Sequence, residues 1–294
     1  MRKTSITLAL AGALATPAIV LAADPTPEHT FAPNVGVVSD YLFRGVSQTH
    51  GKPALQAGLD YSHSSGLYAG IWASTITWVK DFTGGGTTEV DLYGGYKNTF
   101  AGGDWNYDFG LIHYHYPGAG SATAGNAALV SQLYSPNTTE VYAAIGYKWL
   151  TAKYSHTVSS NFIGWVPTTT AGAYDTTKTS RGSNYLELNA AYDLGDGWGV
   201  SGHVGHQKVK NVSDSAALRD ADYTDWNVGV TKDMGFGVVG LTYSDTNAKG
   251  SCSNPLPATN VSNYCWGTSM NTVTPSGYKD VARGTVVLSF KKTF

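Results

Sequence analysis

The sequence has 294 residues, with 19 Lys and Arg against 21 Asp and Glu, and it contains no basic cluster that would indicate a nucleic-acid-binding protein. Gly (35 residues), Tyr (19) and Trp (8) are frequent, while charged residues make up only 14%, which favours β-structure with tight turns. Beyond the N-terminal segment no run of 18 apolar residues occurs, so the sequence excludes membrane-spanning helices but not membrane-spanning strands.

The N-terminal segment has the pattern of a secretory signal peptide. Two basic residues precede an apolar run over 6–21, which ends at Ala22 and Ala23. The run is shorter than the roughly 20 residues that a spanning helix needs, and small residues at its end suit a cleavage site. We therefore expect a signal peptide over 1–22 and one exported domain over 23–294.

From residue 34 onward the chain divides into about twelve segments in which polar and apolar residues alternate, separated by clusters of Gly, Asp, Asn and Pro. They are 34–44, 53–62, 66–78, 88–99, 104–116, 139–149, 151–160, 183–194, 198–209, 223–233, 236–246 and 283–294. Alternation with period two is typical of strands with one apolar and one wet face. The segments predict an all-β fold, and their even number suits a transmembrane antiparallel up-and-down β-barrel of about 12 strands.

Two further features of these segments favour a membrane barrel. In the segment around 88–100, Val90 and Leu92 share one face, and Glu89 and Asp91 share the other. The connections between segments alternate between a few residues and long loops, as they do in outer-membrane barrels, whereas a soluble β-sandwich has no reason to sort its connections in this way.

The opening of the mature chain carries a family resemblance. Ser39-Asp40-Tyr41, Phe43-Arg44-Gly45 and Ser47-Gln48-Thr49, followed by the strand Glu89-Val-Asp-Leu-Tyr-Gly-Gly-Tyr96, resemble the TorF-family porins of proteobacteria. The resemblance extends over most of the mature chain but not over its long loops. It implies an outer-membrane barrel more strongly than it implies transport of any particular solute.

Charged residues on the predicted strands are expected to face the lumen, because Lys or Arg on the lipid face near the midplane costs about 2 to 4 kcal/mol. The candidate pore-lining residues are Asp40, Arg44, Asp60, Glu89, Asp91, Lys97, Asp108, Glu140, Lys148, Lys153 and Glu187. They form either a selectivity ring in an open channel or ion pairs that plug the barrel. Asp40 and Arg44 lie too far apart along one strand to pair with each other, and we expect Asp60 to be a partner.

The histidines offer weaker signals. His113 and His115 share a face, as metal ligands on a strand would, but two histidines among tyrosines are more typical of the aromatic girdle at the membrane interface. His203 and His206 fall on opposite faces and indicate no site. We therefore expect no metal and no cofactor.

An enzyme is a further alternative, because outer-membrane phospholipase A is also a twelve-stranded barrel, with His and Ser at a His-x-Ser spacing. The nearest likeness is His156-Thr-Val-Ser159, where a spacing of three places the side chains on opposite faces of a strand. We expect no enzymatic activity.

The two cysteines, Cys252 and Cys265, lie in one stretch rich in Asn, Ser and Pro. An exported chain meets an oxidising compartment, so we expect a disulfide. Zinc is the second alternative, since two thiols without a nearby His make half a site.

The C-terminal segment ends on an aromatic residue within a strand. Val286, Leu288, Phe290 and Phe294 share one face, and this ending resembles the signal read by the outer-membrane assembly machinery. An apolar edge strand in a soluble sheet would invite aggregation, whereas a closed barrel has no edge. We expect a bacterial outer-membrane location, with membrane lipid, lipopolysaccharide and the assembly machinery as partners.

These patterns together predict passive diffusion of small hydrophilic solutes or ions. The alternative is a closed barrel whose long loops bind or adhere outside the cell.

Overall fold

The computed structural model describes residues 27–119, 135–167, 175, 177–212, 221–253, 260–268, 270 and 276–294. The expected signal peptide lies outside these residues. Within the described ranges, no helix has the length and apolar character needed to cross a membrane.

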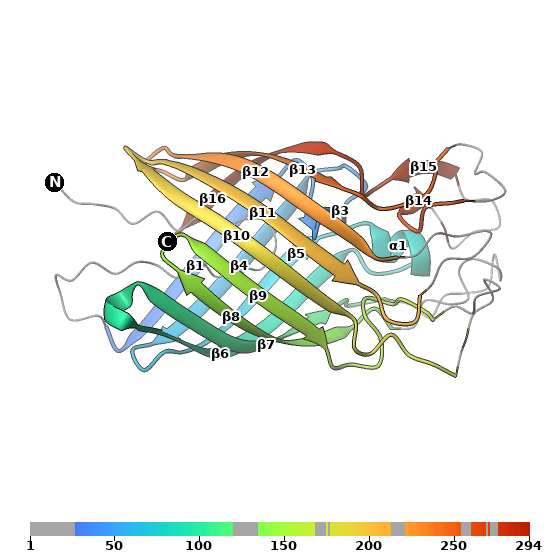
Figure 1. The fold of residues 1–294 in the computed structure, drawn as a ribbon. Coiled ribbons are helices and arrows are strands. Elements are labelled where there is room, and N and C mark those ends of the chain that lie inside the picture. Colours follow the sequence, from blue (N-terminus) through green and yellow to red (C-terminus); the bar gives the residue numbers. More distant parts are fainter. Residues whose placement is uncertain are drawn as a thin grey trace.

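In the described residues, twelve strands close into one antiparallel barrel (Figure 1), which confirms the predicted fold class. Each strand pairs with its neighbours along the chain, and the first and last strands pair to close the ring. The barrel strands are β1 (His29–Val38), β4 (Ala54–His63), β5 (Leu67–Thr75), β6 (Thr88–Phe100), β7 (Trp105–His115), β8 (Thr138–Tyr147), β9 (Leu150–Thr157), β10 (Asn184–Gly195), β11 (Trp198–Lys208), β12 (Tyr223–Asp233), β13 (Val238–Thr246) and β16 (Thr285–Thr293).

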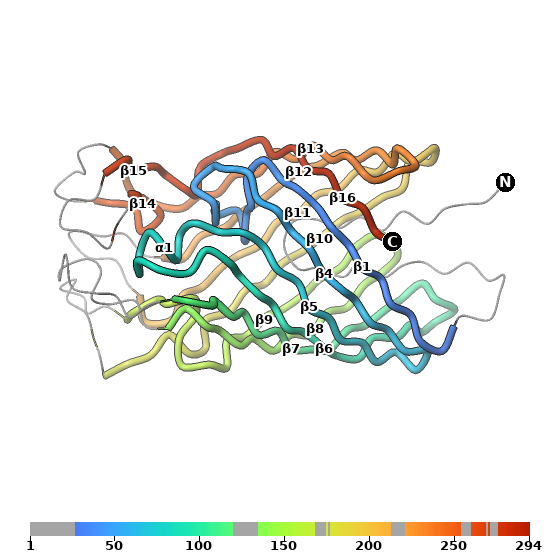
Figure 2. Tube along the Cα trace, turned by 180° about the vertical axis from the view of Figure 1, so that it is seen from behind, coloured from blue at the N-terminus to red at the C-terminus, as the bar shows by residue number. Residues whose placement is uncertain are grey.

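The two ends of the barrel differ (Figures 1 and 2). The end that we name the turn end holds the start of β1, the C-terminal Phe294 and the short connections. These are 64–66, 101–104, 148–149, 196–197 and 234–237. The opposite end, named the loop end, is where the long connections leave the strands. These are 39–53, 76–87 and, with parts outside the described residues, 116–137, 158–183, 209–222 and 247–284.

The elements outside the barrel wall are short. The loop end carries the ribbon β2 (Leu42–Phe43) with β3 (Val46–Ser47), the helix α1 (Trp78–Thr83) and the ribbon β14 (Cys265–Thr268) with β15 (Ser276–Asp280). The 3-10 turn η1 (Ala101–Gly103) lies at the turn end. Helix α1 ends at Thr83 and is capped by Gly84, whose φ of 80° is a conformation that glycine adopts without strain.

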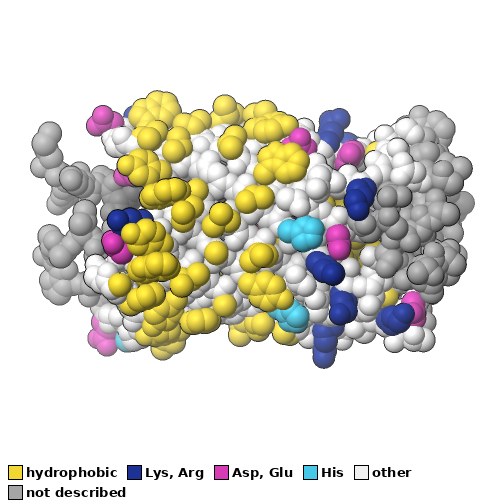
Figure 3. Space-filling view, in the orientation of Figure 1, with side chains coloured by type: hydrophobic (Ala, Val, Ile, Leu, Met, Phe, Trp, Pro, Cys, Tyr) yellow, Lys and Arg dark blue, Asp and Glu magenta, His cyan; other side chains and the backbone are white. Residues whose placement is uncertain are grey.

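The outer wall is apolar. Leu92 on β6 and Leu288 on β16 are 47% and 56% exposed, and Figure 3 shows hydrophobic side chains spread over the wall, most densely towards the turn end. In water such a surface would aggregate, whereas in lipid it is solvated. The closed ring also gives the backbone N–H and C=O groups of every strand a hydrogen-bond partner. The protein is therefore a membrane-spanning barrel of the bacterial outer membrane.

Two predicted strands end earlier than expected. The segment predicted as 34–44 forms β1 only to Val38, after which the chain folds into the barrel, and the segment predicted as 66–78 ends at Thr75 and continues into α1. Alternation alone could not mark these ends, because side chains on the departing chain are still alternately buried and exposed as far as Asp40.

Candidate functional site in the barrel lumen

The lumen is lined by alternate side chains of the barrel strands. Glu89 and Asp91 on β6 are each 1% exposed, while Leu92, the residue after Asp91, faces outward. Among the candidate pore-lining residues, those on inward strand positions are Asp60, Glu89, Asp91, Lys97, Asp108, Glu140, Lys153 and Glu187. Lys148 differs, because it occupies the turn between β8 and β9 with a φ of 52° and pairs with the exposed Asp104 at 3.8 Å.

Asp40 and Arg44 reach the lumen by another route, on the segment 39–53 between β1 and β4, which we name the inward segment. Asp40 is buried and accepts hydrogen bonds from Ser47 Oγ at 2.6 Å and Thr49 Oγ1 at 2.9 Å. Thr49 Oγ1 in turn accepts a hydrogen bond from the backbone N–H of Tyr41 at 3.2 Å. The part of the family resemblance that lies in 39–49 therefore builds the inward segment itself.

Arg44 extends from the inward segment to strands that are not neighbours of β1 or β4. Its Nη2 lies 2.6 Å from Glu140 Oε2 on β8, and its Nη1 donates to Gln207 Oε1 on β11 at 2.6 Å. The plane of Tyr185 on β10 lies beneath the guanidinium, with 4.3 Å between Cζ and the ring centroid. A buried bidentate pair with further hydrogen bonds is the geometry in which an ion pair is strongest.

Glu140 accepts hydrogen bonds from two hydroxyl groups in addition to those from Arg44. Tyr114 OH donates to Oε2 at 3.2 Å and Thr157 Oγ1 donates to Oε1 at 3.3 Å. The carboxylate is fully buried, so all three groups act on it away from bulk water. We name the group of Arg44, Glu140 and Gln207 the latch.

The expected pairing of Arg44 with Asp60 is wrong. Asp60 on β4 accepts hydrogen bonds from Tyr93 OH at 2.5 Å and Asn34 Nδ2 at 3.3 Å. Because the chain leaves the barrel wall after Val38, Arg44 is not on a strand beside β4.

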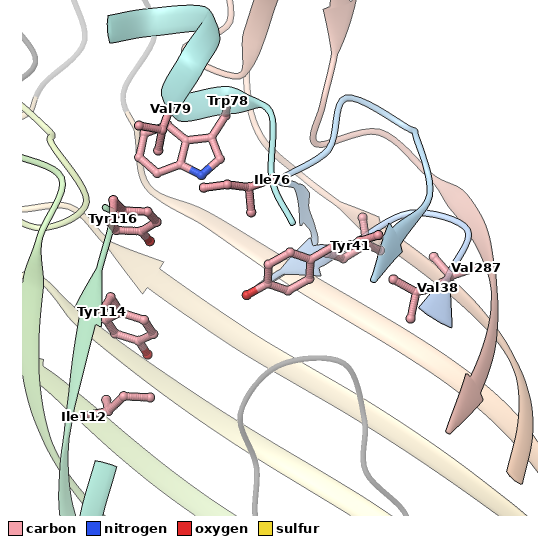
Figure 4. Packing of buried hydrophobic residues seen from close by; sticks show 11 residues of the cluster. Val38, Tyr41, Ile76, Trp78, Val79, Ile112, Tyr114, Tyr116 and Val287 are labelled. Atoms are coloured by element: carbon pink, nitrogen blue, oxygen red, sulfur yellow. The ribbon is translucent and has the colours of Figure 1, made fainter. Parts of the chain in front are cut away.

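Apolar side chains fill the loop end of the lumen around the latch (Figure 4). Tyr41 of the inward segment, Trp78 of α1 and Tyr114 and Tyr116 at the end of β7 point into one cluster. The Trp78 and Tyr116 rings meet edge to face with centroids 5.2 Å apart. The inward segment therefore packs as part of a core and not as a free loop.

Glu89 and Asp91 lie beside this cluster with incomplete hydrogen bonding. Tyr116 OH donates to Glu89 Oε1 at 3.3 Å, whereas Glu89 Oε2 and Asp91 Oδ1 are buried without a hydrogen-bond partner among the described residues. Two carboxylates two positions apart on one strand face repel each other, and a buried oxygen without a partner is costly.

The turn-end half of the lumen is polar and carries charges of both signs. Tyr68 OH donates to Asp108 Oδ1 at 2.6 Å and also contacts Tyr142 OH. Lys153 Nζ lies 4.2 Å from the Tyr142 ring centroid, and Lys97 Nζ lies 5.1 Å from that of Tyr68. The described residues fill this half only in part, since Asp108, Lys97 and Lys153 all keep part of their surface exposed.

A second polar group lies on β10, β11 and β12, and of its members only Glu187 was predicted from the sequence. His203 Nε2 is 2.9 Å from Asp225 Oδ1, and His203 Nδ1 is 2.7 Å from Asn189 Oδ1 and 3.6 Å from Glu187 Oε2. Tyr185 OH donates to Asp225 Oδ2 at 2.8 Å. His203 and His206 do face opposite sides, and the signal available was that His203, Gln207 and Asp225 occupy alternate positions on predicted strands.

The other candidate residues lie away from the lumen. The chain forms the Cys252–Cys265 disulfide at the loop end. His113 and His115 face outward with ring centroids 6.1 Å apart. The residues on the outer face of the C-terminal strand are Val286, Leu288, Phe290 and Phe294.

His156 and Ser159 do not meet. His156 Nδ1 bonds to Tyr154 OH on the outer wall, whereas Ser159 Oγ donates to the Asn161 carbonyl and accepts from the Thr139 N–H.

The closed ring, apolar wall and charged lumen define a porin-like outer-membrane barrel. The chain belongs to the family described as "Bacterial protein of unknown function (Gcw_chp)", whose model matches residues 22–275. This description carries no TorF name, and the TorF label stays a resemblance. A search of the curated proteins finds no match.

Among solved structures, the chain is similar to the KdgM porin, with 8% identity, a TM-score of 0.46 and coverage of 90% of this chain and 99% of the other. It is also similar to the NanC porin, with 10% identity, a TM-score of 0.45 and coverage of 90% and 98%. A third is the COG4313 outer membrane channel from Pseudomonas putida F1, with 10% identity, a TM-score of 0.45 and coverage of 92% and 99%. Similarities of this size carry no argument about what this chain binds or transports.

Proposed function

We propose that this protein is a porin-like channel for small hydrophilic solutes or ions, closed at its loop end by the inward segment. The observation that carries the proposal is the contrast inside one lumen. Charges of both signs line the turn-end half, whereas the loop end is obstructed by a segment anchored on the far wall through one arginine. A barrel that conducts no solute has no need of partly exposed lysines and carboxylates in its lumen, whereas a channel uses such charges to attract hydrophilic solutes.

The proposed pore-lining residues are those on the wall of this lumen, namely Asp60, Glu89, Asp91, Lys97, Asp108, Glu140, Lys153 and Glu187. Short turns lie in the periplasm and long loops outside the cell in barrels of this kind, so the turn end is assigned to the periplasm. Solutes then enter the polar half from the periplasm freely, and passage to the outside depends on the inward segment.

Opening requires the latch to break. Arg44 would have to leave Glu140, Gln207 and the face of Tyr185 together, and the inward segment would have to leave the apolar cluster around Tyr41. Packed cores of this kind switch between discrete arrangements, so we expect stepwise opening and not a graded change of width.

The test is single-channel recording in planar bilayers. We expect small or infrequent conductance steps for the wild-type protein and larger, more frequent steps for Arg44→Ala, because that variant releases the inward segment from the far wall. Lys148→Ala is the matched control, since it removes a basic residue that lies outside the lumen. A bilayer that stays silent for both the wild type and Arg44→Ala would exclude the channel.

A closed barrel whose loops bind or adhere outside the cell is the second candidate function. It is favoured by the amount of apolar packing at the loop end, where two further buried clusters lie around Tyr264 and around Phe162. The same recordings decide between the two, because a closed barrel stays silent when the latch is removed.

The partners follow from the outer surface. We propose that the outward residues Val286, Leu288, Phe290 and Phe294 are read by the outer-membrane assembly machinery. Membrane lipid contacts the apolar wall, and lipopolysaccharide contacts the loop end.

A further inference from the structure

A cluster of metal-ligating side chains lies at the turn end, on the outer wall and apart from the lumen. His29 on β1 and His63 on β4 are direct cross-strand partners. Glu28 precedes β1, and its carbonyl accepts a hydrogen bond from the Ser64 N–H at 2.9 Å. The backbones of all three residues are therefore held by the sheet or by the β4–β5 turn.

The spacing of the side chains already approaches that of ligands around one ion. One ligand atom from each of the three residues lies within 4.8 Å of the others, and this is the one such group of three among the residues searched, those that the structure describes. His63 Nε2 and Glu28 Oε1 are 3.5 Å apart, and the two imidazole centroids are 5.1 Å apart. Two ligand atoms that each lie about 2.1 Å from a tetrahedral zinc ion are separated by about 3.4 Å.

Hydrogen bonds to the far side of each ring orient the imidazoles. His29 Nδ1 bonds to Tyr61 OH at 2.9 Å, whereas His63 Nδ1 accepts a hydrogen bond from the Ser65 N–H at 3.1 Å and lies 2.7 Å from Ser65 Oγ. With Nδ1 engaged, Nε2 of each ring is the atom presented to a metal. When His63 Nε2 coordinates an ion, Nδ1 must carry the proton, so the Ser65 N–H gives up its hydrogen bond to Nδ1. Nδ1 then donates to Ser65 Oγ, which is the outer-shell arrangement common to metal-binding histidines.

We propose that Glu28, His29 and His63 bind one divalent transition-metal ion of the zinc class. Two imidazoles and one carboxylate are a ligand set that zinc accepts, with the fourth position left to water. The site is exchangeable, because the Glu28 side chain is 72% exposed. It is independent of whether the lumen conducts.

The chain offers a matched control on the same outer surface. His113 and His115 lie on β7 with stacked rings 6.1 Å apart, and His113 Nδ1 bonds to Thr139 Oγ1 at 2.9 Å. This pair resembles the proposed site in its two histidines, but the group of three ligand residues that could hold an ion does not include it.

The experiment is calorimetric titration of zinc chloride into the processed, untagged protein refolded in detergent. We expect about one zinc ion per barrel, and affinity at least about tenfold weaker for His29→Ala and for His63→Ala. Glu28→Gln and Ser65→Ala should weaken binding less, because one removes only the charge of a ligand and the other acts through the His63 ring. Binding should weaken at acid pH, since a metal-ligating imidazole must be neutral.

Heat-modifiable migration in gel electrophoresis shows that each variant is folded, and cobalt absorption in the visible range reports the coordination geometry. His113→Ala should bind zinc as the wild type does. The proposal is overturned if the wild type binds no zinc at millimolar concentration, or if folded His29→Ala and His63→Ala bind it as tightly as the wild type.

Discussion

The two halves of the lumen are enclosed by the same twelve strands but differ in what fills them. In the loop-end half, the inward segment and α1 bring Tyr41 and Trp78 against the wall, and Arg44 pairs with a fully buried carboxylate. In the turn-end half, Lys97 and Lys153 lie over tyrosine rings and stay partly exposed.

The difference follows from where polar groups find their partners. In the loop-end half, Arg44 and Glu140 are held by specific contacts away from water, so removing one partner of this pair costs free energy that water does not restore. In the turn-end half water is available, so removing a charge changes the local field more than it changes stability. Substitutions in the two halves should therefore have different kinds of effect.

The largest effect is expected from Glu140→Ala. This change leaves the Arg44 guanidinium in the closed lumen without its carboxylate, which costs about 3 to 5 kcal/mol when one partner of a buried pair is removed. Since about 1.4 kcal/mol corresponds to a tenfold change in an equilibrium, the open probability should rise by a large factor. Single-channel recording measures it.

Glu187→Ala is the control, because Glu187 is an inward glutamate that contacts Asn189 and His203 and not Arg44. Equal open probabilities for Glu140→Ala and Glu187→Ala would show that the latch does not hold the inward segment. If Arg44 and Glu140 act as one pair, the double variant Arg44→Ala, Glu140→Ala should lose less free energy of closing than the sum of the losses in the two single variants.

The sequence predicts the wall well and the latch poorly, and the reason is physical. Lipid requires every barrel strand to present an apolar face, so a residue such as Leu92 marks the facing of Glu89 and Asp91 from local pattern alone. Arg44 and Glu140 are 96 positions apart and meet only because the chain leaves the wall after Val38.

The proposed metal site shows the same limit. His29 and His63 become neighbours only through the register of β1 with β4, and no motif in the sequence marks a pairing across 34 positions. Lys148 is the opposite case, because it continues the polar alternation of β8 but falls in the turn, where a positive φ ends the strand.

A smaller effect is expected from Asp91→Asn. Asp91 Oδ1 is buried without a hydrogen-bond partner among the described residues, and Glu89 repels it. The isosteric amide removes the repulsion, so the free energy of unfolding should rise by about 1 kcal/mol. Urea unfolding of the refolded barrel measures it.

Asp60→Asn sharpens this prediction. Asp60 has two hydrogen bonds, from Tyr93 and Asn34, so its amide variant should lose stability. If both variants lose stability to the same extent, Asp91 has stabilising partners that the described contacts do not include.

The smallest effect is expected from Lys153→Gln, which should shift the ion preference of the open channel towards cations without changing its open probability. The shift should be modest, about twofold in the permeability ratio, because Lys97 remains nearby and the field is screened over about 8 Å at physiological salt. The reversal potential under a potassium chloride gradient measures it, with Lys148→Gln as the control.

Lys148 lies in a turn outside the lumen, so an equal shift from both variants would mean that the ions respond to charge at the turn end and not to the wall beside Tyr142. A shift from Lys153→Gln alone would place the path of the ions through the polar half.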